Sequence, residues 1–297
     1  MDQARPLVVV VVDRLLHNIA AAFGGIGDPR LVLKGGTLLR VCALEDHRFS
    51  EDLDFDFVGT PAEFHELAAA AVPAAAATSG VPLTVRAGTA NIIVGWEHEG
   101  LPQSIKLEST FLSSERAETQ DWNVAQRYSE IPPDVSIMGY TLVEVASDKL
   151  KALARRARGR DIYDLATLVR NGVDMTAAWS RYVDSYADPQ REYGKRNHPS
   201  DIRSCYLPRA ERAKQEWQAM AEDGWFPPTV AFDDALAVVD ASVKREVESW
   251  KSSLARGELH QMKFAHREQQ RKACAALRTP PQPETPRPGD PGLSPGM

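Results

Sequence analysis

The sequence predicts an α/β protein with a mixed sheet and its helices over residues 1–140, followed by a mostly helical region. Residues 52–58, DLDFDFV, alternate between acidic and apolar side chains, which is the two-residue period of a strand. After residue 140, apolar residues recur mainly at helical spacing. Strands and helices are therefore expected in separate parts of the chain, an α+β arrangement.

The segments before this strand are predicted to form a helix, a short strand and a second helix. Apolar residues recur at helical spacing over 7–23, and the glycines at 24–25 are expected to end that helix. The apolar run 31–33 is a strand candidate, and a helix is expected to begin at Thr37. The chain between Thr37 and residue 52 allows one helix and a return, which brings both ends to one edge of the sheet.

After the acidic strand, an Ala-rich helix is expected at 62–78. Three further strands are expected at 81–85, 91–96 and 104–110. Their spacing predicts an antiparallel meander that is added to the first sheet.

The remainder of the chain is predicted to be helical, at 141–158, 161–169, 208–222 and 231–256. Gly159 falls where the first of these helices is expected to stop.

We therefore predict three parts: a sheet domain at 1–140, a helical domain at 141–278 and a disordered tail at 279–297. The tail is rich in proline and has almost no large apolar residues, so burial cannot offset its ordering entropy.

Composition narrows the classes of function. The chain carries 35 Lys and Arg against 41 Asp and Glu, a net charge of −6, which argues against coating nucleic acid through bulk charge but allows a local basic face. The 3 cysteines lack CxxC spacing, so no disulfide framework or zinc knuckle is expected, and a cytoplasmic location is favoured. The apolar run 7–12 ends at Asp13, which favours a buried segment over a targeting signal or membrane span. The histidines show no metal-ligand spacing and are expected at surface or packing positions.

Asp52 and Asp54 are the strongest candidates for chemistry. Because the two residues are two apart on a strand, their carboxylates project from one face. Carboxylates this close repel each other, and a divalent cation such as Mg²⁺ relieves the repulsion. The same ion would bridge nucleotide phosphates and offset charge in phosphoryl transfer. The alternative is an ordinary solvated strand face.

The turn Gly35-Gly36-Thr37 complements the two carboxylates. Glycines let the backbone approach a phosphate closely, and the start of the next helix offers unpaired N–H donors. The Thr37 hydroxyl would cap that helix or contact a phosphate oxygen. No GxxxxGK[ST] motif is present, so a P-loop is not expected. Together, turn and strand predict a nucleotide–metal site.

The combination KGGT at 34–37 and RFSEDLDF at 48–55 resembles the nucleotidyltransferase superfamily pattern. With a second block, SDKLKAL at 147–153 and RDIYDL at 160–165, it resembles the AbiEii/AbiGii-type toxins of type IV toxin–antitoxin and abortive-infection systems, in particular the mycobacterial nucleotidyltransferase toxins. The resemblance implies a nucleotidyltransferase-type mixed-sheet domain, a helical domain and an active site in the cleft between them.

The resemblance also implies a reaction. A nucleoside monophosphate would pass from an NTP to the 3′ end of tRNA with Mg²⁺ as cofactor, which would release pyrophosphate, block aminoacylation and stop growth. Pyrimidine nucleotides are favoured and GTP remains open. A cognate antitoxin would be a partner, and the oligomeric state is not predicted.

In the second block, Lys149 would contact nucleotide phosphates. Asp164 would orient Lys149 or assist deprotonation of the attacking hydroxyl, and Asp161 competes for that role. The resemblance supports Lys149 and Asp164, because this family needs both the motif lysine and the later aspartate. Without it, a solvated helix pair with ordinary salt bridges explains these residues.

A local basic face is predicted on the helix that begins near residue 141. With Lys149 it is formed by Arg155, Arg156, Arg158 and Arg160. These arginines would bind an RNA backbone.

The superfamily usually has a third metal carboxylate on a neighbouring strand. Glu108 is the preferred candidate, and Asp56, which continues the face of Asp52 and Asp54, is the alternative. Ser50 is expected to share that face and to contact the nucleotide. Related toxins are regulated near this position, whereas the simpler interpretation is a hydrogen bond within the turn.

Two rival functions remain. An enzyme that nucleotidylates a small molecule, of the aminoglycoside-modifying type, should have an acidic acceptor pocket, whereas the basic run at 149–160 favours RNA. A non-catalytic protein that only sequesters nucleotide or RNA would not need the intact acidic pair, glycine turn and Lys149.

Overall fold

The computed structural model describes residues 7–88, 91–112, 117–187, 198–226 and 230–254. By its internal contacts the chain up to Ser249 forms one compact unit. The predicted tail at 279–297 and the end of the predicted helical domain lie outside the described residues, and the predicted boundary near residue 140 stays a prediction.

The described strands form one mixed sheet in the order β3-β4-β5-β2-β1-β7-β6. They are β1 (Leu31–Lys34), β2 (Asp52–Val58), β3 (Thr84–Ala87), β4 (Asn91–His98), β5 (Leu101–Leu112), β6 (Thr119–Asn123) and β7 (Ser136–Tyr140). β1 is antiparallel to β2 and parallel to β7. The antiparallel meander β3-β4-β5 joins the sheet through β5, which runs parallel to β2. The predicted meander is thus confirmed.

The described helices before β7 are α1 (Leu7–Ile26), α2 (Gly35–Leu38), which continues into the π-helical turn η1 (Leu39–Ala43), and α3 (Pro61–Ser79). After β7 come α4 (Leu142–Arg155), α5 (Gly159–Arg170), α6 (Met175–Ala187), α7 (Ile202–Tyr206), α8 (Ala210–Glu222) and α9 (Phe232–Ser253). Two 3₁₀ turns, η3 (Pro199–Asp201) and η4 (Leu207–Arg209), flank α7. The mixed α/β class is confirmed.

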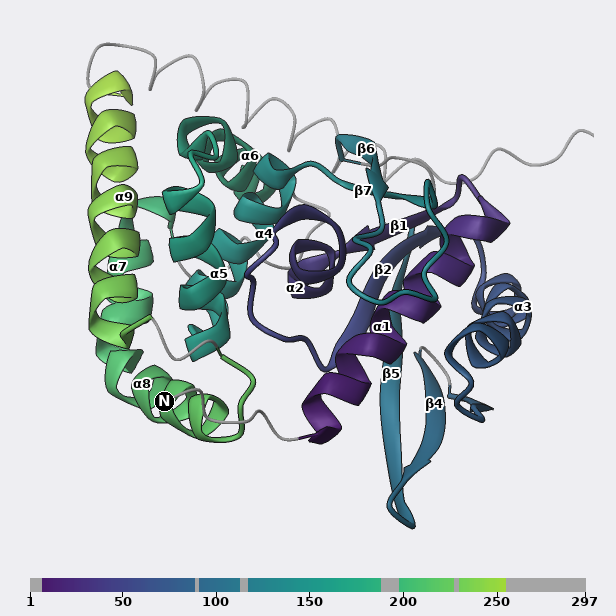
Figure 1. Ribbon diagram of the computed structural model, residues 1–297. Helices are drawn as coiled ribbons and strands as arrows, with labels where there is room; N and C mark the ends of the chain where they lie inside the picture. The colour runs from purple at the N-terminus through teal and green to yellow at the C-terminus, as the bar shows by residue number, and fades with distance from the viewer. Residues whose placement is uncertain (1–6, 89–90, 113–116, 188–197, 227–229, 255–297) are drawn as a thin grey trace, which may run out of the picture. The chain divides into compact units, whose positions relative to one another are not determined.

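β2 separates an apolar face from an acidic face. Leu53, Phe55 and Phe57 are fully buried on one side. The rings of Phe55 and Phe57 lie 6.0 and 5.8 Å from that of Phe64 on α3, and Phe23 of α1 packs 5.1 Å from Phe55. Figure 1 shows α1 and α3 together, away from α4 and α5. Burial of each phenyl ring contributes about 1.5–3 kcal/mol, which fixes the register of β2.

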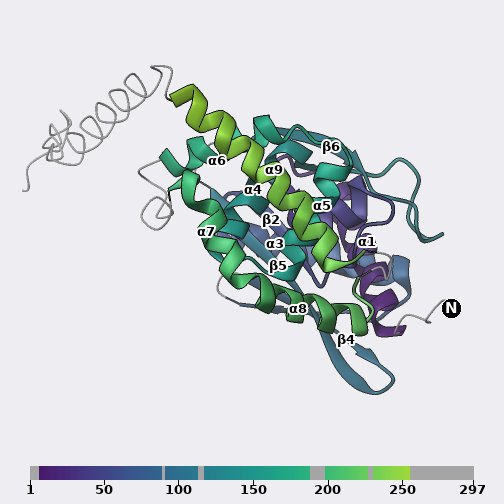
Figure 2. The same ribbon diagram turned by 90° about the vertical axis from the view of Figure 1, so that its left-hand side faces the viewer.

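Helices α4 and α5 stand beside the acidic face of β2, and α7 and α8 cover them from outside. α7 contacts α4, and α8 contacts α5. Figure 2 shows this helical side with α7 and α8 towards the viewer. A Cβ on Gly159 would lie 2.7 Å from the Ala213 carbonyl oxygen, so the first turn of α5 packs directly on the backbone of α8.

Two predicted helix stops are wrong. α1 runs through Gly24, where a Cβ would lie 2.4 Å from the Ser136 carbonyl oxygen, and the left-handed residue that ends the helix is Gly27 (φ 66°). Gly159 does not end α4 but begins α5, and Ala157 takes the left-handed conformation instead (φ 50°). In both places glycine provides close approach between elements rather than a turn.

Helix α1 is the one described helix that is long and apolar enough to cross a membrane, and 61% of its most apolar window is buried inside the protein. Its Asp13 is fully buried and accepts two hydrogen bonds of 2.8 Å from Arg40. We interpret α1 as a core helix, as the sequence predicted.

Candidate active site

The carboxylates of Asp52 and Asp54 project from the acidic face of β2, and neither forms an ion pair with another residue that the structure describes. Burial and the neighbouring Asp54 raise the pKa of Asp52 to about 6. Burial also raises the pKa of Asp54, although Lys149 and Lys34 act in the opposite direction. Two half-buried carboxylates therefore repel each other where a cation would stabilise both.

The two carboxylates fit a divalent cation whose remaining ligands come from a substrate. Among the described residues, no group of three His, Cys, Asp or Glu side chains is placed to hold a metal ion. Mg²⁺ in nucleotide enzymes is bound by one or two carboxylates together with substrate phosphates, so a closed protein cage is not needed. Asp52 and Asp54 would hold the ion, which supplies charge neutralisation at the phosphates.

The glycine turn is built around Asp54. In the register of β1 and β2, Lys34 lies opposite Asp54. The chain then turns at Gly35, whose φ is 72°. A Cβ at Gly35 would lie 2.8 Å from Asp54 Oδ2, so only glycine brings the backbone this close to the carboxylate. The backbone of the turn thus lies beside the predicted metal ligand.

Thr37 and Ser50 hold this turn against the start of β2. The two hydroxyl oxygens are 2.7 Å apart, both residues are buried, and Thr37 donates to the Asp52 carbonyl oxygen. This agrees with the simpler interpretation of Ser50 as a hydrogen-bond partner within the turn. Direct nucleotide contacts of Thr37 and Ser50 stay predictions.

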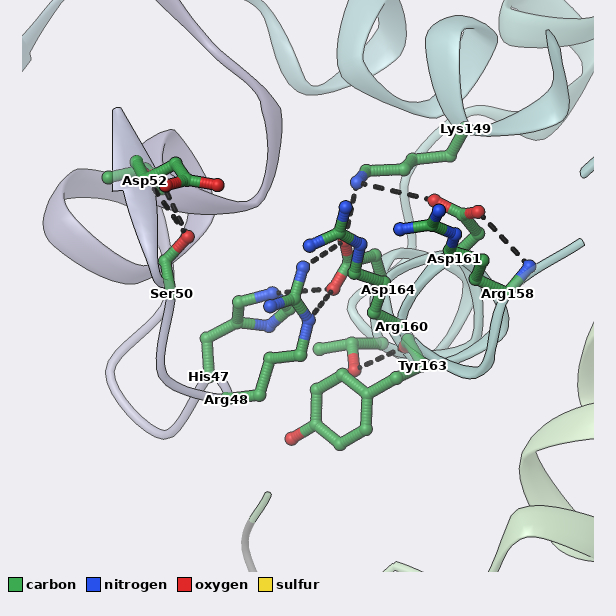
Figure 3. A network of polar contacts seen from close by, with 12 residues as sticks. His47, Arg48, Ser50, Asp52, Lys149, Arg158, Arg160, Asp161, Tyr163 and Asp164 are labelled. Atoms are coloured by element: carbon green, nitrogen blue, oxygen red, sulfur yellow. Dashed lines mark hydrogen bonds and ion pairs between the residues drawn. The ribbon is translucent and has the colours of Figure 1, made fainter. Parts of the chain in front are cut away.

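A buried cluster on α4 and α5 lies opposite the acidic strand (Figure 3). The Lys149 ammonium lies 2.6 Å from Asp164 Oδ2 and 3.9 Å from Asp161 Oδ1. Asp164 is fully buried, yet Arg48 and Lys149 hold its pKa well below the usual range, against the effect of burial. A carboxylate so strongly held as an anion is suited to orient Lys149, and it is a poor proton acceptor.

Asp161 has a different set of partners. Arg156 donates two hydrogen bonds of 2.9 Å to its carboxylate, and the backbone N–H of Arg158 donates at 3.2 Å. The hydrogen bonds from Arg156 and the charges of Lys149 and Arg156 lower the pKa of Asp161 against the effect of burial. Asp161 therefore ties the turn between α4 and α5, whereas Asp164 lies closer to Lys149.

The predicted arginine row is not on one helix. Arg155 ends α4, Arg156 caps it, and Arg158 and Arg160 lie at the start of α5. The turn at Ala157 breaks the row, and the guanidinium of Arg156 is committed to Asp161. Arg160 lies 3.5 Å from Glu51, which precedes the acidic strand. Arg158, Arg160, Glu51 and α8 line a pocket of about 280 Å³.

The two candidates for a third carboxylate differ in their partners. Glu108 of β5 is aligned with Asp54 in the sheet and borders a pocket of about 310 Å³ with it, but it pairs with Lys106. Asp56 is bonded to both Lys34 and the Tyr140 hydroxyl. A role for either in metal binding stays a prediction.

Sequence reasoning missed His47 and Arg48. His47 is buried, and its Nε2 lies 3.0 Å from Asp164 Oδ1. Arg48 donates to both oxygens of Asp164, from Nε at 2.6 Å and Nη2 at 2.8 Å. The one sequence signal was that Arg48 opens the segment RFSEDLDF. Its partner is distant in the chain and follows no local spacing rule.

The fold and this arrangement define a nucleotidyltransferase. The sequence profile of the nucleotidyl transferase AbiEii toxins of type IV toxin–antitoxin systems matches residues 23–238. The chain belongs to this AbiEii family.

Solved structures share the fold. MenT4, a nucleotidyltransferase toxin from Mycobacterium tuberculosis, has 20% identity and a TM-score of 0.61, over 79% of this chain and 82% of that one. A putative nucleotidyltransferase from Helicobacter pylori has 16% identity and a TM-score of 0.54, over 83% and 98%. JHP933 from H. pylori has 16% identity and a TM-score of 0.51, over 86% and 100%. No curated protein gives a sequence match.

Proposed function

We propose that this protein transfers a nucleoside monophosphate from an NTP to the 3′ end of tRNA, in a reaction that depends on Mg²⁺ and releases pyrophosphate. The observation that carries the proposal is the pairing of Lys149 with Asp164 opposite Asp52 and Asp54. A fixed ammonium and two carboxylates without partners are the groups that a triphosphate with its cation needs.

Each group has a defined task in this proposal. Lys149 binds a phosphate oxygen of the triphosphate and withdraws negative charge as pyrophosphate leaves. Asp164 orients Lys149 without exchanging a proton. The backbone of Gly35 and Gly36 lets the triphosphate approach Asp54. Asp52 and Asp54 would hold Mg²⁺, which would supply neutralisation of the phosphate charge.

The proposed acceptor rests on the arginines at the α4–α5 turn. Arg158 and Arg160 line a pocket next to Glu51, one residue before Asp52. Phosphates of an RNA end held there would place a terminal hydroxyl near the acidic strand. Blocking the tRNA 3′ end would stop aminoacylation and growth, and a cognate antitoxin would control the activity. A pyrimidine NTP is the favoured donor.

A small-molecule acceptor is the second candidate, because a different pocket favours it. This pocket of about 310 Å³ has more acidic than basic groups, with Asp56, Glu144, Asp148 and Asp184 against Lys151 and Arg181. Such a lining would attract a cationic amino compound and repel an RNA backbone.

One experiment separates these acceptors. The protein is incubated with Mg²⁺, each labelled NTP and total tRNA, and the RNA 3′ ends are sequenced. We expect added nucleotides on tRNA 3′ ends with wild-type protein and none with Asp52→Asn. Unchanged tRNA ends with every NTP, together with labelling of an aminoglycoside, would replace the tRNA proposal by the second candidate.

A further inference from the structure

The carboxylate of Asp164 is surrounded on all sides by donors from two distant parts of the chain. Lys149 reaches it from α4, whereas His47 and Arg48 reach it from the loop before β2. Arg48 makes a two-point contact, and a Cβ on Gly36 would lie 2.4 Å from Arg48 Nη2. The pair of Arg48 and Asp164 thus packs directly against the glycine turn.

We propose that Arg48, supported by His47, is a positioning residue for nucleotidyl transfer: it fixes Asp164, and Asp164 in turn fixes the ammonium of Lys149. This inference rests on the proposed function only in that Lys149 binds the triphosphate. It requires no particular acceptor.

Charge balance explains why a second cation is needed. Asp164 paired with Lys149 alone would neutralise the ammonium and weaken its hold on a phosphate. Arg48 compensates the carboxylate with two hydrogen bonds, so Lys149 keeps positive charge that acts on Asp54, which lies beside the glycine turn. Arg48 itself is buried, with 5% of its side chain exposed, and has no direct access to substrate.

His47 adds direction to this contact. Because an ionised carboxylate only accepts hydrogen bonds, His47 Nε2 carries a proton and donates a hydrogen bond to Asp164 Oδ1. Oδ1 then receives His47 and Arg48, while Oδ2 receives Arg48 and Lys149. The carboxylate cannot rotate without breaking these bonds.

The loop that carries both residues is anchored independently. Arg40, which is held by Asp13 of α1, donates to the His47 carbonyl oxygen at 3.1 Å. The Phe49 N–H donates to the Trp225 carbonyl oxygen at 3.0 Å. The backbone on each side of Arg48 is therefore fixed, as a positioning residue requires.

The test uses Arg48→Lys, which keeps the charge and loses the two-point contact. The matched control is Arg203→Lys, because Arg203 makes the same contact to Asp240, at 2.8 and 2.9 Å, between α7 and α9. Transfer is measured as pyrophosphate release, NTP affinity by calorimetry and stability by urea unfolding. We expect Arg48→Lys to lower kcat/KM about 10-fold or more and Arg203→Lys to change it less than about 2-fold.

A double-mutant cycle separates positioning from a merely structural role. If Arg48 acts through Lys149, adding Arg48→Lys to Lys149→Ala should lower kcat/KM and NTP affinity no further, although it still lowers stability. An equal loss in both backgrounds, or wild-type kcat/KM and NTP affinity in Arg48→Lys, would overturn the inference. Should Arg48→Lys not fold, His47→Gln and His47→Leu decide. We expect His47→Gln to keep a hydrogen-bond donor to Asp164 and its activity, and His47→Leu to lose the donor and the activity. Equal activity of the two variants would contradict the inference.

The outcomes also separate this inference from the proposed function. Transfer by wild type that Arg48→Lys leaves intact would refute only the positioning role. A wild-type protein that binds NTP without transferring it would refute the proposed function, and the two affinity measurements would still decide on Arg48. A wild-type protein that binds no NTP would refute both.

Discussion

The protein carries two pairs of closely spaced aspartates, and they are electrostatic opposites. Burial and the neighbouring charge of Asp54 raise the pKa of Asp52, and burial together with the charge of Glu108 raises the pKa of Asp54. Asp161 and Asp164 are more deeply buried, yet their pKa values are lowered because arginines and Lys149 surround them.

The difference shows that burial alone does not identify a reactive carboxylate. Asp161 and Asp164 already have charge partners in the folded protein, namely Lys149 and the arginines at 156 and 48. Asp52 and Asp54 form no ion pair with the residues that the structure describes, and protonation or a bound cation relieves their repulsion, so we propose this pair as the ligand site.

The largest effect is expected at the acidic strand. Asp54→Asn should lower transfer by about 1,000-fold or more, because a metal ligand is lost, while the free energy of unfolding stays equal or rises as repulsion is removed. Activity and urea unfolding are measured with Asp121→Asn on the edge strand β6 as control. Near-normal transfer by Asp54→Asn would rule out this site.

At Asp161 and Asp164 the expected effect on stability is the opposite. Asp164→Asn keeps the shape but leaves Arg48 and Lys149 without a buried counter-charge, so the free energy of unfolding should fall by about 3–5 kcal/mol. Urea unfolding at neutral pH measures this loss. A fully stable Asp164→Asn protein would show that the cluster contributes little to the fold.

Lys149→Ala should lower kcat/KM by about 100-fold through loss of phosphate contact and transition-state stabilisation. Steady-state kinetics with varied NTP measures the effect, and Lys151→Ala, two residues further along α4, is its comparison. If Lys149→Ala reduced stability but not kcat/KM, Lys149 would be structural.

Stability against pH should also distinguish the pairs. Asp52 has a folded-state pKa of about 6, above its unfolded value, so its charge destabilises the fold above about pH 6 and the penalty disappears as pH falls to about 4. Asp52→Asn should therefore melt higher than wild type above pH 6 and equally at pH 4. Asp164 has a lowered pKa, so its contribution is present above about pH 4 and is lost only below that.

Sequence patterns predicted most of the fold, because β2 and the long helices carry clear periodicity. They missed β6 and β7, since Thr119–Asn123 is largely polar and exposed and the apolar residues of Ser136–Tyr140 are interrupted by Gly139. They placed Asp52, Lys149 and Asp164 through motifs, but not the contact between Arg48 and Asp164. That contact joins residues far apart in the chain and depends on the packing of α5 against the loop before β2.

The smallest effect is expected at the basic turn. Arg158→Glu should weaken tRNA binding about 10-fold and reduce its salt dependence, with NTP affinity unchanged. Filter binding at several salt concentrations measures this, with Lys244→Glu on the exposed side of α9 as control. Binding that is insensitive to salt would remove the argument for RNA.

We propose that the protein uses Asp52, Asp54 and Lys149 to transfer a nucleotidyl group and not a terminal phosphate. Parallel reactions with NTP labelled at the α- or the γ-phosphate test it directly. We expect that α-label enters the acceptor, that γ-label leaves with pyrophosphate, and that Asp52→Asn abolishes both. Transfer of γ-label to the acceptor, or α-label incorporation by Asp52→Asn, would contradict it.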